Sequence, residues 1–207
     1  MERGSGRRPG PLPLRAILLF LAVVIVLRVA SAWPAVTVWL HPEILGAALF
    51  LYTPFLHYRR GRPPAWTAPG DRGTGFRILA GTAAAGAAVY LAASRLPGVL
   101  PPPLPPEALP PLWEFLVRQA LFVALPEEVF FRGYLYDAFE ERGWEPVLSS
   151  SLLFSAGHLV IHASPYRALT FFPALLFGWA RKRTGGIYVP ILLHFLFNLF
   201  PYLRAAL

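Results

Sequence analysis

The chain has 207 residues, of which 56% are hydrophobic and only 14% are charged. An average soluble domain carries about 25% charged residues, so the composition argues against a soluble globular protein, and the high hydrophobicity argues against a disordered one. The chain has no cysteine, which excludes disulfides, thiolate metal sites and a cysteine nucleophile. The net charge of +8 is typical of nucleic-acid-binding proteins, but in a membrane protein it marks cytoplasmic loops. We therefore expect an integral membrane protein with no nucleic-acid partner.

Seven apolar segments follow one another along the chain, and each predicts a membrane-spanning helix. They cover residues 17–27, 36–56, 78–96, 112–139, 146–163, 168–180 and 187–203. The first segment is followed by Ala30-Ser31-Ala32, which resembles a signal-peptidase site, so cleavage stays an alternative to an uncleaved first span. Residues 97–111 contain too many prolines to form a helix and are predicted to be a stiff extracytoplasmic linker.

The charges in the loops orient this array of spans. If the N-terminus is cytoplasmic, 13 Lys and Arg residues lie on the cytoplasmic side. The residues then left on the other side are Arg95, Arg118, Arg167 and Arg204. By the positive-inside rule, this asymmetry predicts an all-α, polytopic membrane helix bundle of about seven spans with a cytoplasmic N-terminus. Asp137 and Glu140 fall at the cytoplasmic end of the fourth span, where we expect them to be solvated.

The informative residues are the ionisable ones inside the last four spans, because a charge at the bilayer centre costs about 2.5–3.5 kcal/mol. Glu127, Glu128 and Arg132 follow Pro126, which is expected to kink the fourth span or free a carbonyl. Glu128 and Arg132 are four residues apart and can form an ion pair. Glu127 is turned by about 100° from Glu128 and lacks a partner on its own helix. It suits general acid–base catalysis, although a structural ion pair between helices is the alternative.

Two further polar clusters lie on the following spans. Phe154 and His158 share one face of the fifth span, where His158 taken alone would more often be a hydrogen-bonded core histidine. His162 lies near the outer end of that span and is predicted to be interfacial. His194 and Asn198 share a face of the last span, and both can donate hydrogen bonds to a developing oxyanion. The alternative for this last pair is a polar clamp between helices.

Taken together, the three clusters resemble the motifs of the CPBP intramembrane proteases, a family also called Abi or CAAX prenyl protease type II. In chain order these motifs are Glu127-Glu128-x-x-x-Arg132, Phe154-x-x-x-His158 and His194-x-x-x-Asn198. The resemblance divides the chain into N-terminal spans with a Pro-rich linker, residues 1–111, and a catalytic helix bundle, residues 112–207.

The resemblance also implies a role for each residue. Glu127 would activate the attacking water with help from His158, and His194 and Asn198 would form the oxyanion hole. Glu128 and Arg132 would support the site, Arg132 by holding a carboxylate in place. This branch of the family resembles a glutamate protease, with no metal and no cofactor.

The residues themselves leave other chemistries and function classes open. One glutamate and two histidines would also serve as the three protein ligands of a catalytic zinc. We favour the metal-free chemistry because zinc-binding histidines normally come with hydrogen-bonding partners, and few candidates are visible. A non-catalytic immunity factor or scaffold is a second class. A transporter or proton relay is a third, but the sequence lacks an evident inverted repeat.

The expected substrate is a membrane-embedded or lipid-anchored peptide that arrives through the bilayer and is cleaved near its C-terminus. The composition, rich in Arg, Ala and Pro, suggests a bacterial protein, so we expect it in the bacterial inner (cytoplasmic) membrane. Whether the substrate is prenylated, a sorting-signal tail or neither stays open in the sequence.

Overall fold

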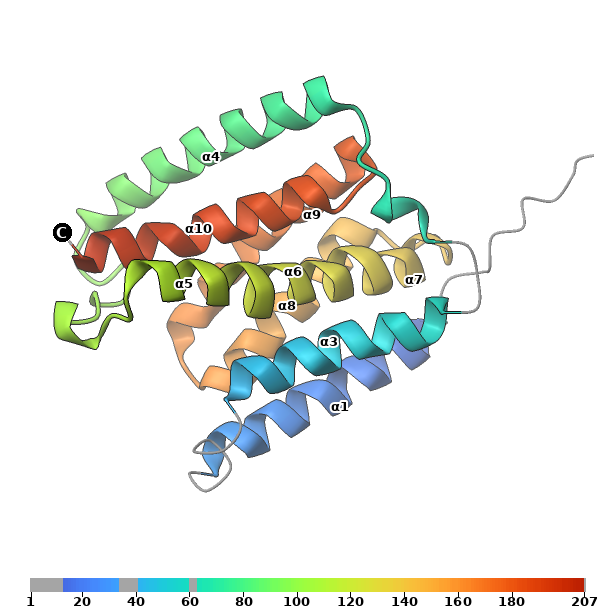
Figure 1. Cartoon of the computed structure of the whole chain (residues 1–207), viewed down its shortest axis with the longest axis horizontal. Coiled ribbons are helices and arrows are strands. Elements are labelled where there is room, and N and C mark those ends of the chain that lie inside the picture. Colours follow the sequence, from blue (N-terminus) through green and yellow to red (C-terminus); the bar gives the residue numbers. More distant parts are fainter. Residues whose placement is uncertain (1–12, 34–40, 60–62, 207) are drawn as a thin grey trace, which may run out of the picture.

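The computed structural model describes residues 13–33, 41–59 and 63–206, and these ranges are mainly helical and contain no β-strand (Figure 1). The helices are α1 (Pro13–Ala32), α3 (Pro42–Tyr58), α4 (Arg72–Ser94), α5 (Leu112–Arg118), α6 (Leu125–Glu128), α7 (Tyr136–Glu140), α8 (Pro146–His162), α9 (Phe171–Thr184) and α10 (Tyr188–Ala206). Two π-helical segments, Gln119–Ala124 and Val129–Leu135, join α5, α6 and α7 into one continuous rod. The described chain therefore forms seven helical rods, namely the α5–α7 rod and six single helices, as the seven apolar segments predict.

Three of these rods, α1, α4 and α10, are long and apolar enough to cross a membrane by length and composition. Helix α8 is a shorter apolar helix of 17 residues. The prediction of an all-α membrane helix bundle is thus confirmed. The cytoplasmic position of the N-terminus stays a prediction.

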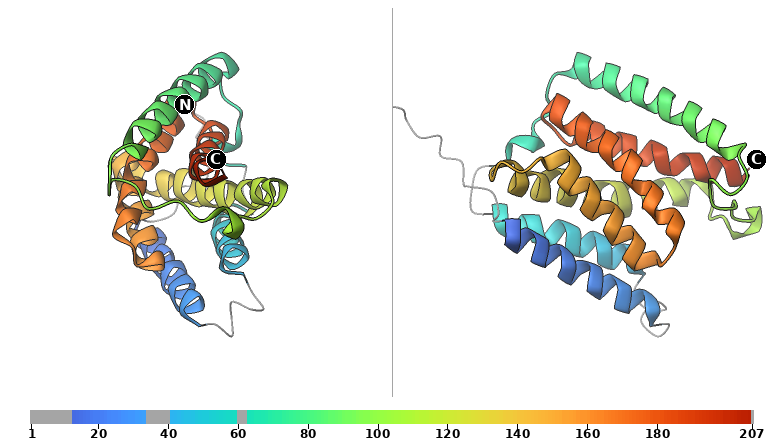
Figure 2. Two further views of the ribbon diagram at one scale, coloured as in Figure 1. Left: turned by 90° about the vertical axis from the view of Figure 1, so that its left-hand side faces the viewer. Right: turned by 180° about the vertical axis from the view of Figure 1, so that it is seen from behind.

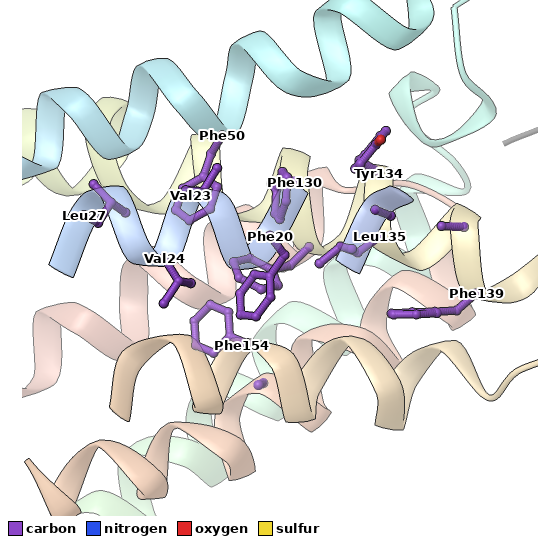
Figure 3. Close-up of a cluster of buried hydrophobic side chains, with 14 residues drawn as sticks. Phe20, Val23, Val24, Leu27, Phe50, Phe130, Tyr134, Leu135, Phe139 and Phe154 are labelled. Atoms are coloured by element: carbon purple, nitrogen blue, oxygen red, sulfur yellow. The ribbon is translucent and has the colours of Figure 1, made fainter. Parts of the chain in front are cut away.

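The α5–α7 rod lies in the middle of the bundle. Helices α1 and α3 pack on one side of it, and α4 lies at the opposite edge beside α10 and α9 (Figure 2). The main core forms where α1, α3, α8 and the rod meet, around Phe20, Phe50 and Phe154 (Figure 3). The ring of Phe131 contacts Phe20 and Phe154 edge to face, at centroid distances of 5.9 and 5.0 Å. Residues from both predicted parts of the chain, 1–111 and 112–207, therefore share one core.

Two helices begin or end at other residues than the apolar segments predict, because interactions at the helix ends determine their length. Helix α4 begins at Arg72 rather than at Ile78, because the Asp71 carboxylate accepts the backbone N–H of Thr74 at 2.7 Å and caps the helix. Helix α9 continues through its basic residues to Thr184 and ends at a left-handed Gly185 with φ 73°. In the second apolar segment, residues 36–40 lie outside the described residues.

The rod is disturbed around Pro126, as predicted. Proline has no N–H to donate, and the N–H of Leu125 bonds the carbonyl of Ala120, five residues back. The resulting π-helical segments lie immediately before and after α6, which is only four residues long. Such π segments inside α-helices are frequent at functional sites. Glu127 and Glu128 therefore sit on a short α-helical piece between two widened turns.

Candidate active site

The predicted ion pair between Glu128 and Arg132 forms in the centre of the bundle. Nη1 of Arg132 lies 3.1 Å from Oε1 of Glu128, and both side chains are fully buried. Nη2 of Arg132 donates to the carbonyl of Ala174 on α9 at 2.9 Å. The guanidinium also lies over the rings of Phe154 and Phe177, at 4.8 and 5.5 Å from their centroids. Arg132 therefore neutralises Glu128 and ties the rod to α8 and α9.

His194 of α10 shares the same carboxylate. Its Nδ1 lies 2.9 Å from Oε1 of Glu128, and its ring stacks on Phe177 at 5.2 Å. The carboxylate beside Arg132 is ionised and can only accept, so Nδ1 of His194 carries the proton. In the neutral ring, Nε2 then has a free lone pair. That atom faces Glu127, with Nε2 3.8 Å from Oε2.

His158 of α8 is oriented in the same way. Its Nδ1 donates to the carbonyl of Phe154 at 3.0 Å, and its ring stacks on the Phe154 ring at 4.4 Å. Its Nε2 lies 3.9 Å from Oε2 of Glu127. Oε2 of Glu127 is itself buried and has no hydrogen-bond partner among the described residues. Two imidazole nitrogens thus converge on one unpartnered carboxylate oxygen, at distances slightly beyond a direct hydrogen bond.

Asn198 lies one turn further along α10 than His194. Its Nδ2 donates to Oε1 of Gln119 at 2.8 Å. Gln119 begins the first π-helical segment of the rod. Gln119 was not among the residues singled out from the sequence. The available signal was an amide side chain within an otherwise apolar segment, eight residues before Glu127.

An apolar cavity of about 120 Å³ leads to Glu127 and His158 from between α1, α3, α8 and the rod. Its apolar lining includes Phe20, Val24, Leu27, Phe50, Phe122 and Phe131. The polar lining residues include Glu43, at the start of α3, and His162, at the end of α8. Glu43 is held by Arg118, whose Nη2 lies 2.9 Å from its Oε2. The cavity therefore presents an apolar surface to a ligand beside Glu127 and His158.

The prediction that Asp137 is solvated is wrong. The Tyr58 hydroxyl donates to Oδ2 of Asp137 at 3.0 Å, and Nη2 of Arg181 lies 3.5 Å from Oδ1. The ends of α3 and α9 meet the rod here and supply these partners. Glu140, in contrast, is exposed as predicted.

The donors around Glu127 are of the types that zinc uses, and both histidines have an Nδ1 partner of the kind that zinc-binding histidines normally have, so the expectation that such partners are few is wrong. The donors are, however, spread wider than in a zinc site. Two ligands of one tetrahedral zinc lie about 3.3 Å apart, given bond lengths of about 2.0–2.1 Å. In this site the Nε2 atoms of His158 and His194 are 3.9 and 3.8 Å from Oε2 of Glu127. Within the described ranges, no group of three His, Cys, Asp or Glu side chains is arranged to hold a metal ion. Zinc binding would require these side chains to draw together.

The comparison with known proteins agrees with the motifs. Residues 109–200 match the family described as type II CAAX prenyl endopeptidase, Rce1-like, and all three polar clusters fall within this match. The chain is also 31% identical over 158 residues to an "Uncharacterized 24.3 kDa protein" of Escherichia coli, covering 70% of this chain and 71% of that protein. No solved structure matches the chain significantly. The chain belongs to the Rce1-like family of type II CAAX prenyl endopeptidases.

Proposed function

We propose that the protein is an intramembrane endopeptidase in which Glu127 activates a water molecule without a metal. Membership in the family supports a membrane peptidase of the CAAX type. The activation of water by Glu127 without a metal is supported by the surroundings of its Oε2. This atom is buried, has no hydrogen-bond partner among the described residues and faces Nε2 of both His158 and His194.

The hydrogen bonds of His158 determine how a water would be held. Since Nδ1 of His158 donates to a carbonyl, its Nε2 accepts. A water between Glu127 Oε2 and His158 Nε2 donates one hydrogen to each and directs a lone pair at the scissile carbonyl. As the new C–O bond forms, Glu127 takes the proton from the water. When the C–N bond breaks, that proton passes to the departing amine, and Glu127 returns to its ionised form.

The oxyanion requires donors, and His194 can supply one from Nε2 only as an imidazolium. Its Nδ1 proton is already committed to Glu128. Glu127 and Nε2 of His194 together hold one proton. In the reactive form this proton lies on His194, and Glu127 is ionised. Asn198 has a second N–H beyond the one given to Gln119, and this proton is available as the other donor.

The substrate we propose is a membrane-embedded or lipid-anchored peptide cleaved near its C-terminus. The apolar lining of the cavity supports a hydrophobic ligand that reaches the site from the bilayer. The composition and the Escherichia coli relative support a bacterial cytoplasmic membrane as the location.

Glu127→Gln in the native host tests this proposal directly. The C-termini of membrane proteins are compared by mass spectrometry in strains carrying wild-type protein, Glu127→Gln or no protein. Glu140→Gln is the matched control, because Glu140 is an exposed glutamate of the same rod. We expect Glu127→Gln to accumulate the same unprocessed C-termini as the deletion, and Glu140→Gln to resemble wild type. A Glu127→Gln strain with wild-type C-termini would instead favour a non-catalytic immunity or scaffold protein.

A further inference from the structure

Arg181 of α9 is a buried cation that the proposed mechanism does not use. Only 7% of its surface is exposed. Its Nε donates to the backbone carbonyl of Arg132 at 3.1 Å, and its Nη2 lies 3.5 Å from Oδ1 of Asp137. The guanidinium also lies over the ring of Tyr136, 4.9 Å from the centroid. Arg181 therefore holds the rod between residues 132 and 137, where the second π-helical segment passes into α7.

The bond to the Arg132 carbonyl is explained by the widened turn. In a regular α-helix this carbonyl would accept the N–H of Tyr136, four residues further on. Here the N–H of Tyr136 bonds the carbonyls of Phe131 and Gly133 instead, five and three residues back. Because a buried carbonyl without a donor costs free energy, the side chain of Arg181 stabilises this form of the turn.

One face of α9 holds both the backbone and the side chain of Arg132. The spacing of Ala174, Phe177 and Arg181 places them on the same face of the helix. The carbonyl of Ala174 accepts Nη2 of Arg132 at 2.9 Å, and the Phe177 ring lies 5.5 Å from its guanidinium. Arg181 completes this set by binding the Arg132 backbone.

The position of Arg132 matters because two short bonds connect it to the catalytic candidates. Its Nη1 lies 3.1 Å from Oε1 of Glu128, and that oxygen accepts Nδ1 of His194 at 2.9 Å. Nε2 of the same imidazole faces Oε2 of Glu127 at 3.8 Å. A shift of the Arg132 backbone would therefore move the imidazole that faces Glu127.

We propose that Arg181 is a positioning residue for hydrolysis. By binding the Arg132 carbonyl in the widened turn, it sets the position of the Glu128–Arg132 pair and, through Glu128, the direction of Nε2 of His194. This rests on the proposed function and adds a residue outside the three motifs to its machinery. The competing interpretation is that Arg181 only neutralises Asp137.

Two single variants separate these interpretations. Arg181→Lys keeps a positive charge beside Asp137 but has no nitrogen at the position of Nε, so the donor to the Arg132 carbonyl is lost. Asp137→Asn has the opposite effect, because it removes the carboxylate and leaves that donor in place. Arg183→Lys is the matched control, since Arg183 lies on the same helix and is exposed.

The assay is cleavage by purified full-length protein of a synthetic peptide with the C-terminal sequence of a membrane protein that stays unprocessed in the Glu127→Gln strain. We expect Arg181→Lys to lower kcat about 10-fold per folded molecule, the effect of losing one buried hydrogen bond, with KM changed less than about 2-fold. Asp137→Asn should lower kcat less, and Arg183→Lys should match wild type. The double variant Arg181→Met/Asp137→Asn leaves no uncompensated charge and should fold, but its kcat should also be low.

Wild-type kcat in Arg181→Lys or in the double variant would overturn the assignment. Equal losses of kcat in Arg181→Lys and Asp137→Asn would also overturn it and would show that the two residues form a purely structural ion pair. A rise in KM without a change in kcat would contradict positioning as well. Failure of the proposed function would look different, because wild-type protein would then leave the peptide uncleaved.

Discussion

Replacing Arg132 by alanine removes the only cation within ion-pairing distance of Glu128 among the described arginines and lysines. Among the partners that the structure describes, only His194 then still bonds the fully buried carboxylate, and the bond to the Ala174 carbonyl is lost as well. Breaking a buried pair by deleting one partner costs about 3–5 kcal/mol, because the remaining charge is uncompensated. Since about 1.4 kcal/mol is a factor of ten, the ratio of folded to unfolded protein should fall by roughly 10²–10⁴.

The assay is reversible unfolding of the purified protein in mild detergent, together with the yield of monodisperse protein after expression. Arg132→Ala should lower both stability and activity. In the double variant Glu128→Gln/Arg132→Met, both charges are removed and no uncompensated charge remains, so most of the stability should return. Activity should stay low, because His194 no longer bonds an ionised carboxylate.

Two results would refute this reasoning. One is an Arg132→Ala protein with wild-type yield and activity, which would show that the buried pair is unimportant. The other is a double variant whose loss of stability equals the sum of the single losses, because residues that interact directly are expected to be strongly non-additive.

The remaining predictions concern the oxyanion donors and the orientation of the chain. Asn198→Ala should lower kcat about 10²–10³-fold with little change in KM, whereas a matching rise in KM would show a role in substrate binding instead. Gln119→Leu, which removes the acceptor for Asn198, should lower kcat by part of that factor, and Gln119→Glu, which keeps an acceptor, should lower kcat less. Equal kcat values in the two variants would show that Gln119 does not position Asn198. The cysteine-free chain allows single-cysteine labelling with an impermeant maleimide. Arg95→Cys should react in intact cells and Arg142→Cys only after lysis; the reverse would invert the topology.

The local features of the site could be predicted from the sequence. The Glu128–Arg132 pair depends only on helical spacing, and the separation of Glu127 from that pair follows from the same geometry. Pro126 predicted a disturbed helix, although its form as two π-helical segments was not foreseeable from one residue. These features are local because they involve neighbours on one rod.

The features that were missed depend on contacts between distant parts of the chain. The bond from His194 to Glu128 joins residues 66 apart, and it fixes which ring nitrogen carries the proton. Asn198 and Gln119 are 79 residues apart, as are Tyr58 and Asp137. Polarity near a span end predicted solvation for Asp137, whereas α3 and α9 leave its side chain only 19% exposed and supply Tyr58 and Arg181 as partners. Sequence patterns identify which polar residues matter, but helix packing decides their partners.

The central claim, that Glu127 activates water without a metal, is tested most directly by peptide cleavage with purified protein after exhaustive chelation. Glu127→Gln keeps the size of the side chain and removes its negative charge and its ability to take a proton. The substrate is a synthetic peptide with the C-terminal sequence of a membrane protein that stays unprocessed in the Glu127→Gln strain. We predict that chelated wild-type protein cleaves this peptide at its full rate, and that Glu127→Gln, folded to the same yield, does not. Cleavage by Glu127→Gln at the wild-type rate, or wild-type activity that is lost on chelation and restored by stoichiometric zinc, would contradict the account.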